Sequence, residues 1–283
     1  MLRKRQKKNP EKEMSFLDHL EDLRWHLIRA TLSVIIVAVL AFIFKDFIFD
    51  TIIFGPKNAD FITYKILCDV TRYIGIVEAF CFEELPFTIQ SRTMAGQFSA
   101  HIWTSIAAGF VIAFPYVIYE FWKFIKPGMK DNEKTSARGF IFFSSLLFFI
   151  GVLFGYYVVS PLSINFLGSY QVSSQVLNEF DLSSYIGLIR TSVIASGLIF
   201  ELPILIYLLT KAGLVTPEFL KKQRKINIVI VLIISGIITP PDVASQIIVA
   251  IPIIILYEIS ILISKMVVKK EEKKEMAKKA KTS

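Results

Sequence analysis

The side chains of this sequence that could bind a charged group are carboxylates in apolar surroundings. Glu201 lies within the run IFELPILI, and a charged carboxylate that faces lipid at such a depth is costly. Pro203, two residues later, removes a backbone hydrogen bond and predicts a kink in the helix. We therefore interpret Glu201 as a group that faces other protein, water or a partner, or that is protonated. A buried structural hydrogen bond is the alternative.

A second group of carboxylates lies in the stretch 14–27, MSFLDHLEDLRWHL. Ser15 followed by Asp18 is typical of a helix start, and Asp18 and Asp22 lie one helical turn apart. Two like charges at this spacing repel each other, so the pair would favour binding a cation from elsewhere. The alternative is that both belong to the solvated face of a surface helix. The opposite side of the helix is apolar, with Phe16, Leu20, Leu23 and Leu27. The pattern predicts a helix that lies on a membrane surface and turns into the bilayer near Leu27.

The connector FWKFIKPGMKDNEKTS, residues 121–136, combines interfacial aromatic residues with a Pro-Gly turn and a further carboxylate, Glu133. If Glu133 and Asp22 lie on the same side of a membrane, each could accept a guanidinium through charge-assisted, often bidentate hydrogen bonds. The alternative is that Glu133 pairs with a neighbouring lysine on the surface. A further acid, Glu120, stands just before this connector.

The sequence contains no arrangement that predicts an enzyme. It has three histidines and lacks the CxxC, HExxH, P-loop and GxSxG patterns. We therefore expect no catalytic residue, no metal and no cofactor.

The elements that must position these carboxylates are long apolar segments. The chain has 283 residues, of which 54% are hydrophobic and 20% charged, and this is too apolar for a soluble domain of its size. We predict an all-α, multi-pass membrane protein, because lipid leaves an open backbone unsatisfied. Six spans are predicted, of which the last two are short: Trp25–Phe44, Gln97–Trp122, Gly139–Ser160, Tyr185–Leu209, Ile226–Thr239 and Gln246–Ile263. Gly151 and Gly155 form a GxxxG pair that would permit close helix contact.

The distribution of basic residues predicts the orientation. Lysine and arginine gather before the first span, in two connectors and in the tail, whereas the segments 161–184 and 240–245 contain none. Both termini are therefore expected in the cytoplasm. The net charge of +8 is explained by this topology, so no nucleic-acid partner is predicted. We divide the chain into a basic cytoplasmic N-terminus (1–14), a six-span membrane domain (15–264) and a basic cytoplasmic tail (265–283), which we expect to be disordered.

Two cysteines, Cys68 and Cys81, fall in the long outer connector 45–96. A disulfide between them is plausible if the outer compartment is oxidising, and two free thiols are the alternative.

Four segments resemble the TatC family, the membrane receptor of the twin-arginine protein translocase. They are HLEDLR (19–24), FWKFIKPG followed by Glu133, FELP (200–203) and TPPDVASQ (239–246), within a resemblance that runs from about residue 15 to residue 264. The resemblance implies a protein of the bacterial inner membrane that binds twin-arginine signal peptides of folded cargo. It also implies recruitment of TatA-type and TatB-type subunits, transport driven by the proton gradient, and several copies in one complex.

The resemblance also assigns roles to single residues. Asp22, Arg24, Phe124 and Glu133 would bind the signal peptide, and Glu201, Asp242 and Gln246 would contact partner subunits. Two positions depart from the family pattern: Asp22 stands where a glutamate is usual, and Glu120 stands where an uncharged amide is expected. The competing interpretation is a proton-coupled secondary transporter that uses Glu201, although the six spans show no internal repeat.

Overall fold

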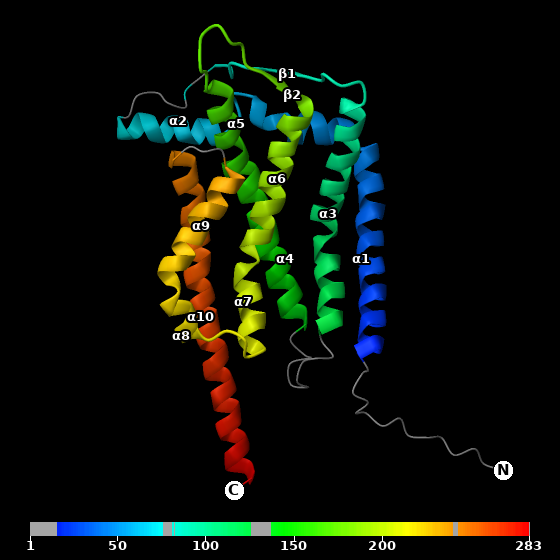
Figure 1. Cartoon of the computed structure of the whole chain (residues 1–283), viewed down its shortest axis with the longest axis vertical. Coiled ribbons are helices and arrows are strands. Elements are labelled where there is room, and N and C mark those ends of the chain that lie inside the picture. Colours follow the sequence, from blue (N-terminus) through cyan, green and yellow to red (C-terminus); the bar gives the residue numbers. More distant parts are fainter. Residues whose placement is uncertain (1–15, 76–80, 82, 126–136, 240–242, 283) are drawn as a thin grey trace, which may run out of the picture.

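The structure, a computed structural model, describes residues 16–75, 81, 83–125, 137–239 and 243–282. Figure 1 shows long helices that run side by side along the molecule, with a smaller group of elements across one end. Five helical stretches are long and apolar enough to cross a membrane: Leu20–Ile43, Gly96–Ile125, Gly139–Ser169, Leu182–Lys211 and Ser245–Lys273. They confirm a mostly helical protein with several membrane-length apolar helices, and they overlap the first four predicted spans and the sixth.

The first helix, α1 (Phe16–Ile43), runs without a break, so the predicted turn into the bilayer near Leu27 is wrong. No proline or glycine interrupts its 28 residues, and the backbone hydrogen-bond ladder therefore continues from the charged stretch into the apolar one.

The last two predicted spans differ from each other. The fifth corresponds to α9 (Arg224–Ile238), whose 15 residues fall short of the roughly 20 needed to cross a bilayer directly. The sixth is not short, because α10 (Val243–Thr282) extends over 40 residues. The basic tail from Lys265 continues this helix instead of being disordered, since its lysine, glutamate, methionine and alanine residues all favour helix.

The other long stretches are segmented. After α3 (Gly96–Ile125), one stretch consists of α4 (Ala137–Phe154), a π-helical turn η5 (Gly155–Val159) and α5 (Ser160–Ser169). The next stretch is divided into α6 (Leu182–Phe200) and α7 (Leu202–Lys211), and the short α8 (Pro217–Lys222) leads to α9.

Small residues bring these helices close together. A Cβ atom added to Gly151 would lie 2.6 Å from the carbonyl oxygen of Ser196, and one added to Gly155 would lie 2.6 Å from that of Ser192. The predicted GxxxG contact is thus the crossing of α4 and η5 against α6. Gly109 plays the same part between α3 and α1, where an added Cβ would lie 2.7 Å from the carbonyl oxygen of Val34.

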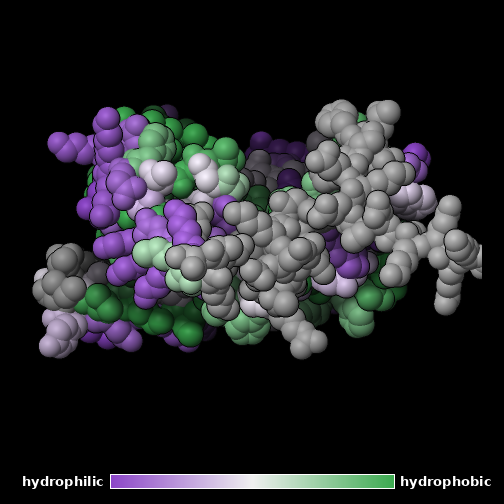
Figure 2. Space-filling model, turned by 90° about the horizontal axis from the view of Figure 1, so that it is seen from below, coloured by the Kyte–Doolittle hydropathy of each residue, from purple (hydrophilic) through white to green (hydrophobic). Residues whose placement is uncertain are grey.

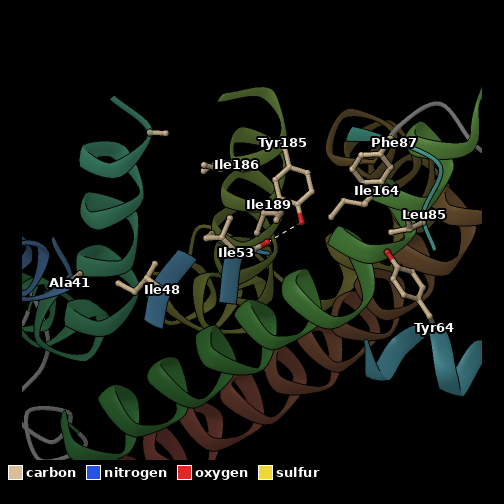
Figure 3. Packing of buried hydrophobic residues seen from close by; sticks show 11 residues of the cluster. Ala41, Ile48, Ile53, Tyr64, Leu85, Phe87, Ile164, Tyr185, Ile186 and Ile189 are labelled. Carbon is tan, nitrogen blue, oxygen red and sulfur yellow. Dashed lines mark hydrogen bonds between the residues drawn. The ribbon is translucent and has the colours of Figure 1, made fainter. Parts of the chain in front are cut away.

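The group across one end of the molecule consists of η1 (Phe47–Ile53), η2 (Gly55–Lys57), α2 (Ile62–Ile74) and a parallel pair of short strands, β1 (Thr88–Gln90) and β2 (Glu179–Asp181). Figure 3 shows its buried cluster, in which the Tyr185 hydroxyl donates a hydrogen bond to the carbonyl oxygen of Ile53 at 3.0 Å. The Tyr64 hydroxyl lies 3.0 Å from the carbonyl oxygens of Pro56 and Pro161. Burial raises the pKa of this hydroxyl, which stays a neutral donor.

Two further contacts, a disulfide and a helix cap, stabilise this end of the molecule. The structure joins Cys68 of α2 to Cys81 in a disulfide, with the Cα atoms 5.0 Å apart. The Asp181 carboxylate accepts hydrogen bonds from the backbone N–H groups of Ser183 at 2.8 Å and Arg92 at 3.3 Å, and it caps α6. These bonds, that of Ser183 first, lower the pKa of Asp181 below its usual value.

The start of α1 and the end of α10 both point to the opposite end of the molecule, on different sides of it (Figure 1). Figure 2 looks onto that end, and hydrophilic side chains gather there on the side where α8 and α10 lie.

Candidate functional site

The end of the molecule where α1 starts contains a buried carboxylate. The side chain of Glu120, in the last turns of α3, is only 2% exposed. Its Oε2 atom accepts a hydrogen bond from Nδ1 of His26 on α1 at 2.6 Å. Its Oε1 atom lies 3.2 Å from Nζ of Lys123, and Nη1 of Arg29 lies 3.9 Å from Oε2. Three basic side chains therefore surround one carboxylate and join α1 to α3.

The three basic side chains of this cluster are more accessible than the acid. The side chain of His26 is 18% exposed, that of Lys123 38% and that of Arg29 52%. Arg29 and Lys123 thus reach the surface while Glu120 remains inside. Burying a carboxylate costs free energy unless charged or hydrogen-bonding partners compensate, and here the two helices supply them from both sides.

Phe124 lies beside this cluster. Its ring is 6.5 Å from the ring of His26, at an interplanar angle of 63°. The neighbouring Trp122 is fully buried and packs on Phe140 of α4, with ring centroids 4.4 Å apart. The end of α3 is thereby held between α1 and α4 just before the connector that carries Glu133.

Asp22 lies on the surface, on the face of α1 that leads to the cluster. It precedes His26 by four residues and Arg29 by seven, so the three side chains share one side of the helix. Asp22 is exposed, and no ion pair among the described residues includes it. Arg24 is also exposed but points roughly 200° away from Asp22 around the helix, so the structure does not bring these two residues together. Glu133 lies outside the described residues.

Glu201 occupies the break between α6 and α7. Its backbone N–H contacts the carbonyl of Leu198, three residues back, and Pro203 follows at the start of α7, so the predicted interruption of this helix is confirmed. The Ser144 hydroxyl of α4 donates a hydrogen bond to Oε2 of Glu201 at 2.8 Å. The other oxygen, Oε1, is buried and has no hydrogen-bond partner among the described residues. One oxygen of this carboxylate is thus left unsatisfied within the described part of the chain.

Gln246 has a role within the chain. Its Nε2 atom donates a hydrogen bond to the carbonyl oxygen of Leu232 at 2.8 Å and lies 3.1 Å from the position of a Cβ on Gly236. It therefore holds the start of α10 against α9. Asp242, four residues earlier, lies outside the described residues.

Sequence reasoning missed the pairing of His26 with Glu120 and the bond from Ser144 to Glu201. The sequence could have suggested the first pairing. His26 lies near the start of the first predicted span and Glu120 near the end of the second, and these two ends are expected on the same side of the membrane. Among the described residues, no group of three or more His, Cys, Asp or Glu side chains is arranged to hold a metal ion.

The fold and this geometry can now be compared with known proteins. A family model described as "Sec-independent protein translocase protein (TatC)" matches residues 18–252. The TatC protein of Blattabacterium sp. subsp. Periplaneta americana is 44% identical over 265 residues, covering 93% of this chain and 100% of that protein. The TatC protein of Aquifex aeolicus is 34% identical over 260 residues, covering 92% of this chain and 98% of that protein.

Solved structures agree with the sequence comparisons. The structure titled "Crystal Structure of Twin Arginine Translocase Receptor- TatC in DDM" matches with a TM-score of 0.67 and 33% identity, over 87% of this chain and 99% of that one. A second, titled "Crystal Structure of Twin Arginine Translocase Receptor- TatC", matches with a TM-score of 0.63 and 32% identity. This chain belongs to the TatC family of Sec-independent protein translocases and is a membrane component of a protein transport system, not an enzyme.

Proposed function

We propose that this protein is the receptor of a twin-arginine translocase, and that it binds the signal peptide of folded cargo at the end of the molecule where α1 starts. The observation that carries the proposal is the Glu120 cluster. By joining α1 to α3, it holds the exposed Asp22 and the beginning of the Glu133 connector at the same end. The internal acid Glu120 already pairs with His26, Lys123 and Arg29, so the proposal assigns the two incoming guanidinium groups to the exposed Asp22 and to Glu133.

The proposed orientation places this end in the cytoplasm of a bacterium and the chain in its inner membrane. Lysine and arginine are concentrated in the segments near this end, in agreement with the positive-inside rule. In this arrangement α9 is the fifth span and α10 the sixth. A helix of 15 residues rises only about 22 Å, so the bilayer must thin around it or α9 must lean on its longer neighbours. Arg224 at the start of α9 pairs with Glu258 of α10 at 2.5 Å, which supports the two helices as a hairpin.

Photo-crosslinking tests the receptor assignment. A photoreactive residue placed beside Glu133 is expected to crosslink to a peptide with a twin-arginine signal and not to the same peptide with a twin lysine. Arginine can bond a carboxylate through two parallel N–H groups, which lysine lacks. Equal crosslinking of the two peptides, or no crosslinking in correctly inserted protein, would mean that Asp22 and Glu133 are ordinary surface charges and do not recognise the signal.

We further propose that Glu201 binds a partner, a single-span TatA-type or TatB-type subunit, through a polar side chain. The unpartnered Oε1 atom of Glu201 supports this proposal, because a donor from a partner helix would satisfy it. Asp242 and Gln246 are proposed to contribute at the outer turn before α10. Gln246 also holds α9 and α10 together, because its side chain is hydrogen-bonded to the carbonyl oxygen of Leu232.

Replacing Glu201 with alanine separates the two proposed sites and also tests the alternative of a proton-coupled transporter. We expect the Glu201→Ala protein to crosslink to the twin-arginine peptide as the unchanged protein does, and to lose co-purification of the TatA-type subunit. Ser144→Ala is the matched control, since it removes the internal bond to Glu201 and leaves the carboxylate. Proton-coupled uptake of a small solute by vesicles containing only this chain, abolished by Glu201→Ala, would instead favour the transporter.

A further inference from the structure

Helix α2 carries an apolar surface that none of the helices around it covers. Four side chains recur at helical spacing along it, and we call them the α2 stripe: Ile62, Ile66, Val70 and Tyr73. Their exposed fractions are 54%, 54%, 45% and 93%. At 100° per residue these four positions fall within about 80° of one another, so they form one narrow face of the helix.

The other sides of α2 have different surroundings. Tyr64 is 1% exposed and fixes the helix to the buried cluster through its hydroxyl. Lys65 and Arg72 project about 100° further around the helix, into an open and polar hollow of about 1170 Å³ that Glu83 and Glu84 also line. The stripe, the buried side and the charged side thus occupy three separate arcs of one short helix.

Contacts with a membrane-spanning stretch fix the rotation of α2 about its own axis. Thr63, which borders the stripe, donates a hydrogen bond to the carbonyl oxygen of Tyr157 in η5. Phe61, just before α2, stacks on the ring of Tyr157 with centroids 5.6 Å apart. On the buried side, the disulfide of Cys68 ties α2 to Cys81. These contacts turn the stripe toward the span and leave the charged side away from it.

The stripe is continuous with the surface that the span presents to lipid. Tyr157 is 40% exposed and Leu153, one turn deeper in α4, is 53% exposed, and both belong to the membrane-spanning stretch Gly139–Ser169. Figure 1 shows α2 lying across the long helices at the end opposite the termini, which is the position of a helix in the plane of a membrane. Tyr73 lies at the end of the stripe, near the C-terminus of α2, and tyrosine suits the boundary between acyl chains and water.

We propose that α2 is an interfacial membrane helix, whose stripe of Ile62, Ile66, Val70 and Tyr73 is inserted among the lipids of the outer leaflet. The partner of this surface is the lipid bilayer itself. A short helix with an apolar face and a charged face beside it binds membranes in this way, and here the disulfide and the bond from Thr63 orient it in advance. The insertion of the stripe into lipid stands on the geometry of α2, whereas its assignment to the outer leaflet rests on the proposed orientation of the chain.

Spin labels on neighbouring residues test the proposal. Because Cys68 and Cys81 are paired, a single added cysteine at Ile66, Val70 or Lys65 can be labelled with a nitroxide in the full-length protein. All three side chains are exposed, so the labels fit without disturbing the core. In proteoliposomes, labels at 66 and 70 are expected to be relaxed more by oxygen, which concentrates in lipid, than by a water-soluble nickel chelate. The label at 65, the matched control, is expected to show the opposite preference.

Two results would overturn the proposal. Labels at 66 and 70 that are as accessible to the nickel chelate as the label at 65 would place the stripe in water. Labels at 66 and 70 that are shielded from both reagents would place the stripe against protein. In liposomes that contain only this chain, that protein is a second copy of the chain.

Discussion

Replacing Asp22 with alanine is expected to weaken the binding of a twin-arginine signal peptide by about 10- to 150-fold, because a hydrogen bond to a charged group contributes roughly 1.5–3 kcal/mol. Asp22 is exposed on the face of α1 that leads to the Glu120 cluster, so it can meet a ligand without any rearrangement of the helices. The measurement is a titration of the purified, membrane-reconstituted protein with a fluorescent signal peptide.

Glu21 provides the matched control. Its carboxylate is exposed like that of Asp22 but projects about 100° away around α1, so Glu21→Ala is expected to leave the affinity for the peptide unchanged. Asp22→Glu adds one methylene and keeps the charge, and it should bind at least as tightly as the unchanged protein. If Glu21→Ala and Asp22→Ala weakened binding equally, general acidity and not a defined contact would explain the effect.

The long helices could be predicted from the sequence because each of the first four spans is a long and predominantly apolar run. The end of α10 could not be predicted by the same rule. A change from apolar to basic residues at Lys265 marks where a segment leaves lipid, but it does not stop a helix of good helix formers. In the same way, the charged stretch before Leu27 marks a change of surroundings and not a turn of the backbone.

Individual residues of the candidate site could be predicted from the sequence, but the side-chain pairs that they form could not. The depth of Glu201 and the break near Pro203 follow from the sequence, whereas its partner Ser144 lies 57 residues earlier on α4. That contact exists because Gly151 lets α4 approach α6 closely. His26 and Glu120 are 94 residues apart, and they meet because Gly109 allows α1 and α3 to touch. Side-chain partners of this kind depend on how helices pack, which no local pattern encodes.

The Glu120 cluster leads to the second large effect. Replacing Glu120 with alanine is expected to destabilise the contact between α1 and α3 by about 2 kcal/mol, since it leaves His26 without its acceptor and three basic side chains close together. The loss should be smaller than that for a fully buried ion pair, because Lys123 and Arg29 reach solvent. The measurement is the thermal unfolding of the purified protein together with the titration of the signal peptide.

Glu120→Gln is the informative companion, because it keeps an oxygen that can accept the hydrogen bond from His26 and removes the charge. If the cluster serves to hold Asp22 beside the Glu133 connector, the glutamine protein should keep most of its affinity for the peptide, while the alanine protein loses it at temperatures where both are folded. If the negative charge of Glu120 itself attracted the ligand, both proteins would lose affinity to the same extent. The comparison therefore separates a residue that positions the site from one that binds. The burial of Glu120 among three basic side chains of its own chain favours the first.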